Sequence, residues 1–219
     1  MRDALAKWIE GGAFVEDDGR PTMFFHGTDV HDPFNVFTRF EDQSLGFHFG
    51  SAEAANDRLD QIFRMAPPDE NEGIVIPVHC RARNPLRVDD LYTWGQGSVV
   101  RALVEAGVAG EDEEEFLEDS ACAEMLFAAL EEAGYDCIVY RNLCEAETNA
   151  HDSILVWRAE LLKSPYSQDF ALDDPRLLSQ NETAESDLSD WGYVADCIER
   201  CRVELQGFRR ADDRLVATP

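Results

Sequence analysis

Thr22-Met-Phe-Phe-His-Gly-Thr28 is the stretch that decides the fold, because a short apolar strand there leads directly into His26-Gly27-Thr28. The apolar run, bounded by polar residues, predicts a β-strand. Glycine has no side chain, so the backbone at Gly27 can approach a ligand closely. A histidine at a strand end is more often a simple hydrogen-bonding residue, so this stretch needs support from the rest of the chain.

A second strand is predicted over residues 45–50, Leu-Gly-Phe-His-Phe-Gly. Side chains alternate between the faces of a strand, so Phe47 and Phe49 share one face and His48 takes the other. Ser51 then caps the start of a predicted helix. One buried face and one exposed face would explain this alternation as well as a ligand site would.

A third segment, residues 142–153, is a polar loop between two strongly apolar strands. The loop carries Glu145, Glu147, His151 and Asp152. Functional groups concentrate on loops that rigid strands hold in place. Any one of these carboxylates taken alone is better explained as part of a solvated hairpin loop.

The remaining elements predict an α+β domain. Residues 73–82 form a strand in which Pro77 indicates an edge or bulged position. The pattern is helical from about 98 to 134, and strands follow at 137–140 and 153–157. Strands on both sides of a helical insert, without regular βαβ alternation, favour α+β over a doubly wound sheet.

The composition changes after Ser164. A polar, acidic segment is followed by a predicted amphipathic helix over residues 188–208, which either packs on the body or binds a partner. We therefore expect a domain at residues 1–164, and an acidic linker with a C-terminal helix at residues 165–219.

The charge of the chain limits its partners. Nineteen Lys and Arg stand against 45 Asp and Glu, for a net charge of −26. This balance opposes direct binding to nucleic acid, which needs clustered basic residues. We interpret it as a solvated acidic surface rather than nucleic-acid mimicry or docking on a basic partner. No secretion signal and no apolar run near the ~20 residues of a membrane span is present, so we expect a cytoplasmic protein.

The six cysteines are scattered and are interpreted as reduced and structural. Cys197 and Cys201 lie four positions apart, but no second pair with ligand spacing follows, so we expect no metal site. The sequence also lacks a serine-hydrolase elbow, a P-loop and a Gly-rich dinucleotide fingerprint.

The order of these segments resembles the ADP-ribosyltransferase domains of phage and mobile-element polyvalent proteins. Residues 5–28 match the opening of such domains: a helix with Trp, a Val-x-Asp-x-Gly-x-Pro turn, and a strand ending in His-Gly-Thr. Residues 46–58 resemble the second motif, 76–86 the next strand and its exit, and 134–164 the third motif. The resemblance covers about residues 1–164 in collinear order.

The resemblance implies a split sandwich of two antiparallel sheets, with a helical insert, that holds NAD⁺ in the cleft between them. The C-terminal helical extension lies outside it. By similarity, His26 hydrogen-bonds a ribose hydroxyl and the Gly27 backbone holds the nicotinamide carboxamide, with Thr28 beside them. His48 stands where the poly-ADP-ribose polymerase-like branch has a tyrosine that stacks on nicotinamide, and Phe49 belongs to the same cofactor site. A neutral imidazole can stack there, whereas a cationic one would repel the nicotinamide cation.

The resemblance also calls for a catalytic carboxylate, and two residues qualify. Asp152 lies just before the third-motif strand, where that branch has its glutamate, and Glu145 can reach in from the loop. Departure of nicotinamide leaves an oxocarbenium-like ribose, whose positive charge a carboxylate at the adjacent 2′-hydroxyl stabilises. This chemistry needs no metal.

The expected function is therefore that of an NAD-dependent mono-ADP-ribosyltransferase. Its acceptor is expected to be a macromolecule, in the first place a protein, and its setting that of a toxin-like phage or mobile-element effector in the host cytoplasm. Two alternatives remain open. One is an NAD glycohydrolase, and the other is a catalytically inactive fold that serves as an acidic protein-binding or inhibitor module. The histidine at the tyrosine position favours the module, and the intact His-Gly-Thr segment favours the transferase.

Overall fold

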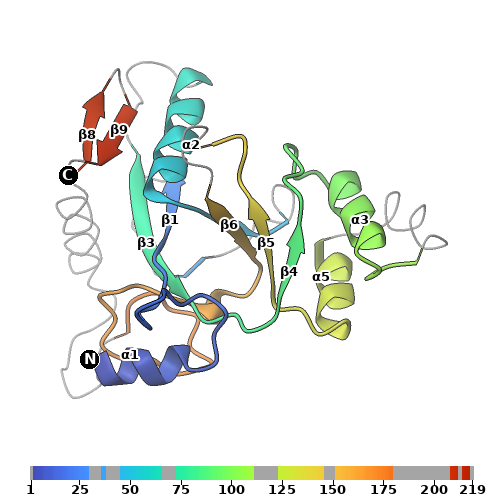
Figure 1. Ribbon diagram of the computed structural model, residues 1–219, viewed down its shortest axis with the longest axis horizontal. Coiled ribbons are helices and arrows are strands. Elements are labelled where there is room, and N and C mark those ends of the chain that lie inside the picture. The colour runs from blue at the N-terminus through green and yellow to red at the C-terminus, as the bar shows by residue number, and fades with distance from the viewer. Residues whose placement is uncertain are drawn as a thin grey trace.

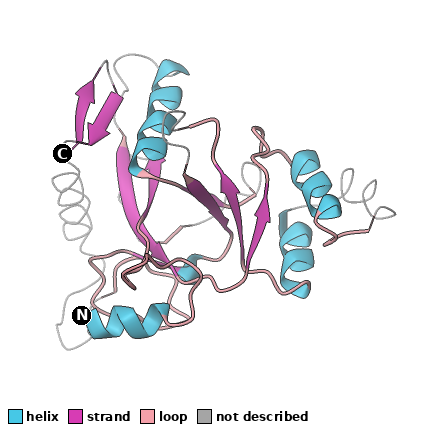
Figure 2. Ribbon diagram, in the orientation of Figure 1, coloured by secondary structure: helices cyan, strands magenta, loops and turns pink. Residues whose placement is uncertain are grey.

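The computed structural model describes residues 2–29, 36–37, 45–65, 73–110, 123–145, 151–179, 208–211 and 214–217 of the chain. In chain order, its elements are α1 (Arg2–Ile9), β1 (Phe24–Thr28), β2 (Phe47–Phe49), α2 (Ala52–Met65), β3 (Ile74–Cys80), β4 (Pro85–Val88), α3 (Gln96–Glu105), α5 (Ala123–Glu132), β5 (Cys137–Arg141), β6 (Asp152–Val156), η2 (Ala159–Leu161), β7 (Leu162–Lys163), β8 (Phe208–Ala211) and β9 (Arg214–Ala217). Strands β1 to β6 occupy the middle of the molecule with helices around them, and the β8–β9 hairpin lies at one edge (Figures 1 and 2).

Two sheets form the body, one in the order β1-β3-β7 and the other in the order β2-β6-β5-β4. All neighbours in them pair antiparallel except β4 and β5, which pair parallel. The α+β class and the predicted pair of antiparallel sheets are thus confirmed, with this one parallel pair as a correction. The sequence analysis gave a strand over residues 73–82 with its exit by residue 86, and so missed β4. Parallel neighbours need a long crossover, and the helical insert between β4 and β5 supplies it.

The two sheets meet where β1 passes the end of β2. The backbone N–H of Phe25 donates to the Gly50 carbonyl at 2.8 Å, and the N–H of Gly50 donates to the Phe25 carbonyl at 2.9 Å. This bridge brings the first two sequence motifs together, although more than a dozen residues separate them in the chain. His26 and His48 become neighbours as a result.

Pro77 lies in β3, the middle strand of its sheet. It pairs with Phe25 of β1 on one side, whereas β7 pairs only with His79 and Cys80. Among the described residues, Pro77 therefore has a strand neighbour on one side only. A proline is tolerated at such a position because no ladder hydrogen bond needs its missing N–H.

The helical insert covers the four-stranded sheet beside β4 (Figure 1). Leu103 of α3 and Leu126 and Leu130 of α5 are fully buried in the main core. Phe127 stacks on Trp157 with ring centroids 5.0 Å apart. The predicted helical region over 98–134 is thus confirmed for α3 and α5, and residues 111–122 within it lie outside the described residues.

Residues 164–179 pack back onto the body. The Ser164 N–H donates to the Leu177 carbonyl at 2.9 Å, and Leu177 joins the main core. The expected domain boundary after residue 164 stays a prediction. Of the predicted C-terminal helix, residues 188–207 lie outside the described residues, while Phe208 begins the β8–β9 hairpin, which the sequence analysis did not predict.

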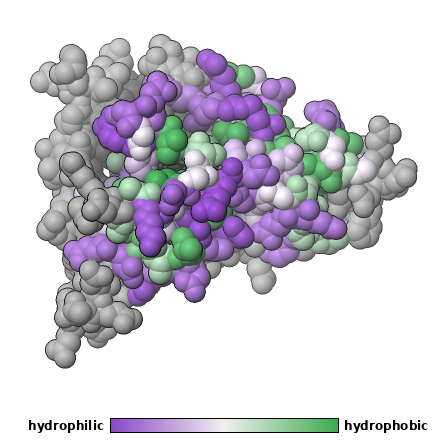
Figure 3. Space-filling model, turned by 60° about the horizontal axis from the view of Figure 1, so that its bottom comes forward, coloured by the Kyte–Doolittle hydropathy of each residue, from purple (hydrophilic) through white to green (hydrophobic). Residues whose placement is uncertain are grey.

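The surface is predominantly hydrophilic on the face turned forward in Figure 3, where hydrophobic side chains form small separate areas. Within the described part of the chain, no helix combines the length and the apolarity that crossing a membrane requires.

Candidate active site

A cavity of about 870 Å³ opens where the two sheets meet. This volume lies in the usual range of small-molecule sites, about 300–1,000 Å³. All but one of the site residues predicted from sequence line it. Those that do are His26, Gly27, Thr28, His48, Phe49 and Glu145. Asp152 does not.

His26 is held in one tautomer by the backbone of β2. Its Nδ1 lies 2.8 Å from the carbonyl oxygen of His48, so Nδ1 must carry the proton and donate it. Burial lowers the pKa of His26, which keeps the ring neutral and leaves Nε2 as a hydrogen-bond acceptor. Phe37 and Phe49 flank the ring at centroid distances of 5.2 and 5.4 Å. Phe49, only 1% exposed, thus supports His26 from the cavity wall.

Gly27 allows β1 to lie close against α2. A Cβ at this position would lie 2.1 Å from the carbonyl oxygen of Ala55, a backbone atom that cannot yield cheaply. Any larger residue would therefore push the strand away from the helix. Helix–strand packing is therefore one reason for a glycine at this position. The close approach of a ligand to the Gly27 backbone, expected from the sequence, stays a prediction.

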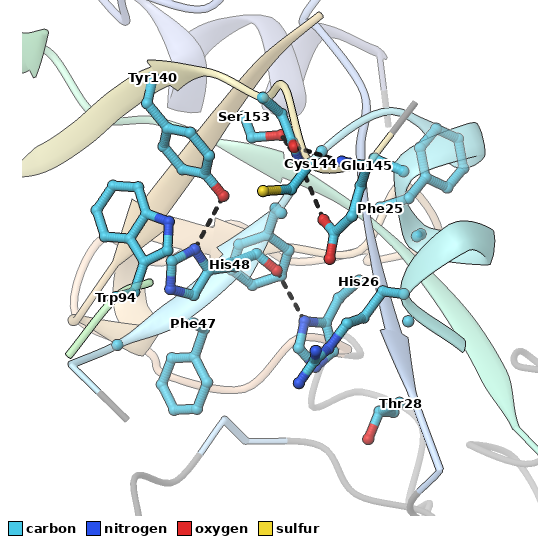
Figure 4. A pocket seen from close by; sticks show the side chains of 18 of the residues that line it. Phe25, His26, Thr28, Phe47, His48, Trp94, Tyr140, Cys144, Glu145 and Ser153 are labelled. Carbon is cyan, nitrogen blue, oxygen red and sulfur yellow. Dashed lines mark hydrogen bonds between the residues drawn. The ribbon is translucent and has the colours of Figure 1, made fainter. Parts of the chain in front are cut away.

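His48 is neutral over the whole physiological range. Burial lowers its pKa to about 3, and the electrostatic effects of the neighbouring His26 and Arg58 act in the same direction. Its Nδ1 lies 2.9 Å from the Tyr140 hydroxyl, and its ring lies edge-on to Trp94 at a centroid distance of 4.9 Å. In Figure 4, Trp94 and Tyr140 lie on one side of His48, and Glu145 and His26 lie on the other. The cationic form of the ring is therefore absent at neutral pH.

This low pKa makes stability depend on pH. Unfolded chains protonate His48 below a pKa of about 6.5, whereas the folded protein does not, so its stability falls as the pH drops below that value. From about pH 7 to about pH 5, we expect the wild type to lose ~2 kcal/mol of unfolding free energy relative to His48→Phe. Urea unfolding of both proteins at both pH values measures this. Parallel losses in the two proteins would show that His48 titrates normally in the fold.

Glu145 is held by its neighbour Asn142 at the end of β5. The Asn142 Nδ2 donates to the Glu145 carboxylate at 3.0 Å, and the backbone N–H of Glu145 donates to Asn142 Oδ1 at 2.9 Å. Burial raises the pKa of Glu145, while the Asn142 hydrogen bond and the Arg58 charge oppose that rise. The carboxylate thus faces the cavity in a defined orientation, partly removed from water (Figure 4).

A chain of hydrogen bonds links Glu145 to His48. Asn142 Nδ2 also lies 3.2 Å from the Ser153 hydroxyl. Ser153 is hydrogen-bonded to the Tyr140 hydroxyl, which reaches His48 Nδ1. Burial raises the pKa of Tyr140, so its hydroxyl remains protonated and can donate. Both predicted motifs therefore belong to one polar network.

Asp152, the other candidate carboxylate, lies on the opposite face of β6. Consecutive strand residues point to opposite faces, so when Ser153 faces the cavity, Asp152 faces away. Asp152 is exposed and forms an ion pair with Arg87 at 2.5 Å. Of the two candidates that the sequence left open, Glu145 lines the cavity and Asp152 does not.

The sequence analysis assigned no role to Arg58, Asp90, Trp94 or Tyr140, which also line the cavity. Arg58 and Tyr140 lie inside segments that carried the family resemblance. Asp90 and Trp94 lie in Asp89-Asp-Leu-Tyr-Thr-Trp94, and the apolar Leu86-x-Val88 pattern of an alternating strand before it was the signal that was missed. Among the described residues, no group of three or more His, Cys, Asp or Glu side chains is arranged to hold a metal ion.

Comparison with known proteins gives one match. The family described as ADP-Ribosyltransferase in polyvalent proteins matches residues 16–171. The match spans both sheets, the cavity residues and the start of the segment that packs beyond β7. No curated protein and no solved structure matches the chain.

Proposed function

We propose, because the chain belongs to the family of ADP-ribosyltransferases in polyvalent proteins, that it is an NAD-dependent mono-ADP-ribosyltransferase whose acceptor is a protein. One observation carries the proposal: a single cavity brings His26-Gly27-Thr28 and Glu145 together, although they lie far apart in the sequence. In cleavage of a ribosyl bond, a carboxylate can stabilise the positive charge that develops on the ribose, and a hydrogen-bond acceptor in the same cavity can orient a ribose hydroxyl.

In the proposed reaction, the bond between nicotinamide nitrogen and ribose C1 breaks, and its electron pair leaves with nicotinamide. His26 Nε2 accepts a hydrogen bond from a ribose hydroxyl, since its Nδ1 already donates to His48. Glu145 stabilises the positive charge that develops on the ribose. The acceptor then forms a bond to C1 and releases its proton to Glu145 or to water. Neutral His48 and the Gly27 backbone line the place for nicotinamide.

Arg58 is proposed to bind the diphosphate of NAD⁺. It is the one Lys or Arg among the described residues that line the cavity, in a chain of net charge −26. A guanidinium matches phosphate oxygens in geometry and in charge. We expect Arg58→Gln to weaken NAD⁺ binding by about tenfold or more, as loss of one charge-assisted hydrogen bond of roughly 1.5–3 kcal/mol implies.

Titration calorimetry checks this, with Arg64→Gln as the matched control, because Arg64 lies on the same helix but not in the cavity wall. Nicotinamide riboside, which carries no phosphate, should bind the wild type and Arg58→Gln equally. Equal NAD⁺ affinities for the Arg58 and Arg64 variants would rule out this role.

The proposed activity is tested by incubating the protein with NAD⁺ and measuring free nicotinamide, with and without cell lysate. Release that needs lysate, with labelled ADP-ribose appearing on protein, supports the transferase. Equal release without lysate and without labelled protein supports an NAD glycohydrolase. No release in either case favours the non-catalytic module. The histidine at the tyrosine position also favours that alternative.

We further propose that the setting is a phage or mobile element, with the enzyme acting as a toxin-like effector on a protein in the host cytoplasm. The family's description as part of polyvalent proteins supports this. The acidic charge of the chain supports a protein acceptor over direct binding to nucleic acid. The predicted C-terminal helix, as a second partner site, remains a sequence-based expectation.

A further inference from the structure

Asp90 lies at the edge of the cavity where β4 and β5 leave their sheet. The two strands are parallel, so the segments that follow them emerge at the same edge. Asp90 follows β4 by two positions, and Leu143 follows β5 by two positions. The Asp90 side chain is only 9% exposed, so its carboxylate needs partners inside the protein.

Both oxygens of Asp90 accept hydrogen bonds from backbone N–H groups. Oδ2 accepts from Leu143 at 2.7 Å, and Oδ1 accepts from Tyr92 at 2.9 Å. Leu143 lies 53 positions away in the chain, so this bond joins segments that only the fold brings together. Hydrogen bonds to a charged acceptor are about twice as strong as neutral ones. One carboxylate thus ties the exit of β4 to the exit of β5.

The segment that Asp90 holds is the turn that carries Glu145. Leu143 lies inside this turn, which is closed on itself by the reciprocal hydrogen bonds between Asn142 and Glu145. Asn142 therefore shapes the turn from within, and Asp90 anchors it to the sheet from outside. Without the anchor, the turn could keep its shape and still move relative to the cavity.

The strained backbone at Tyr92 supports a functional role for the hydrogen bonds that Asp90 accepts. Tyr92 has a φ of 58°, a left-handed conformation in which non-glycine residues are strained by about 1–3 kcal/mol. Its side chain is 63% exposed, so burial offers little compensation. The hydrogen bond from its N–H to Asp90 holds the strained residue in place. Strain of this kind clusters at sites where geometry matters.

We infer that Asp90 is a positioning residue of the proposed reaction, which anchors the turn at 142–145 so that Glu145 faces the ribose of the bound substrate. This inference rests on the proposed function. Asp90 acts through Glu145, so its removal lowers turnover and leaves NAD⁺ binding by β1 almost unchanged. A displacement of about 1 Å at a reacting group can lower a rate by about a hundredfold.

The first test needs no activity. Asn in place of Asp90 keeps one acceptor oxygen but presents an NH₂ group to the other backbone N–H, so one anchor bond is lost. In Asp90→Asn we expect amide hydrogen exchange at Leu143 to quicken by about tenfold or more, and exchange at Glu145, whose N–H is bonded to Asn142, to change less. Asp89→Asn is the matched control, because Asp89 is the exposed neighbour outside the cavity lining. Unchanged exchange at Leu143 overturns the anchoring role.

The second test is kinetic. We expect Asp90→Asn to lower kcat by about tenfold or more, with KM for NAD⁺ within about twofold of the wild type. In the Glu145→Gln background the same change should have little further effect, because residues that act as a unit are not additive. Additive effects, or a changed KM with an unchanged kcat, overturn the inference even where exchange at Leu143 has quickened.

The two hypotheses fail in different ways. A wild-type chain that binds NAD⁺ but releases no nicotinamide under any condition contradicts the proposed function and, with it, a role of Asp90 in the reaction. An active wild type whose Asp90→Asn variant matches Asp89→Asn in kcat contradicts the inference alone. Exchange that quickens together with a non-additive loss of kcat supports both.

Discussion

Replacing Glu145 with glutamine is expected to lower the rate of nicotinamide release by about two orders of magnitude or more, the usual effect of losing one preorganised electrostatic group. The variant keeps the size of the side chain and an oxygen that can accept the Asn142 hydrogen bond, so the turn should persist. The lost charge acts mainly in the transition state, so NAD⁺ affinity should change far less than turnover. Initial rates of nicotinamide release and calorimetric titration of NAD⁺ measure the two quantities.

Asp152→Asn is the comparison, because Asp152 was the rival candidate from sequence. It lies on the outer face of β6 and pairs with Arg87 on the surface. Exposed ion pairs contribute little, about 0–1 kcal/mol, so turnover should stay within about twofold of the wild type. A reversed ranking would identify Asp152 as the catalytic residue. If neither variant is slower than an active wild type, this loop is not part of the active site.

Replacing Asp174 with alanine is expected to destabilise the fold by about 3–5 kcal/mol, because it leaves a buried charge without its counter-ion. Lys163 of β7 is fully buried, and its ammonium lies 3.6 Å from the Asp174 carboxylate. It also donates to the backbone carbonyl of Asp174 at 2.8 Å. Burial tends to raise the pKa of Asp174, but hydrogen bonds from Arg176 and Ser179 bring it well below its usual range.

The sign of the pH effect follows from that depressed pKa. The stabilisation by Asp174 is complete above the pKa of an unfolded aspartate, about 4, and is lost as the pH falls through the lower folded value. Urea unfolding near neutral pH therefore shows the largest difference between the wild type and the variant. Asp173→Ala, at the exposed neighbouring position, is the control and should change stability by less than about 0.5 kcal/mol.

A second variant separates the buried charge from other causes. In the Asp174→Ala background, Lys163→Met removes the unpaired ammonium and keeps most of its volume, so much of the lost stability should return. If Asp174→Ala unfolds no more easily than Asp173→Ala, the segment at 164–179 does not depend on this ion pair.

Local sequence determined the elements whose patterns repeat over a few residues. Alternating or helical spacing of apolar residues predicts the strands β1, β2, β3, β5 and β6 and the helices α2, α3 and α5. This spacing lies entirely within each element, so no distant contact is needed to recognise it. The motif order also indicated His26, Gly27, Thr28, His48 and Glu145, all of which line the cavity. These residues lie in two short strands or in one loop, where an apolar run beside a polar group can be recognised from the sequence alone.

Tertiary structure decided what depends on contacts between distant segments. β4 is four residues long, and its short Leu86-x-Val88 alternation does not encode the parallel pairing with β5 that defines it. Asp152 does not line the cavity because β6 turns its other face there, and the pairing of β6 with β2 and β5 sets that face. The bond between Asp90 and Leu143 spans 53 positions, and such a contact exists only after both strands have joined the sheet. The sequence therefore indicated the candidate groups for the proposed chemistry, and long-range strand pairing decided which of them line the cavity, because side-chain direction in a sheet follows from register.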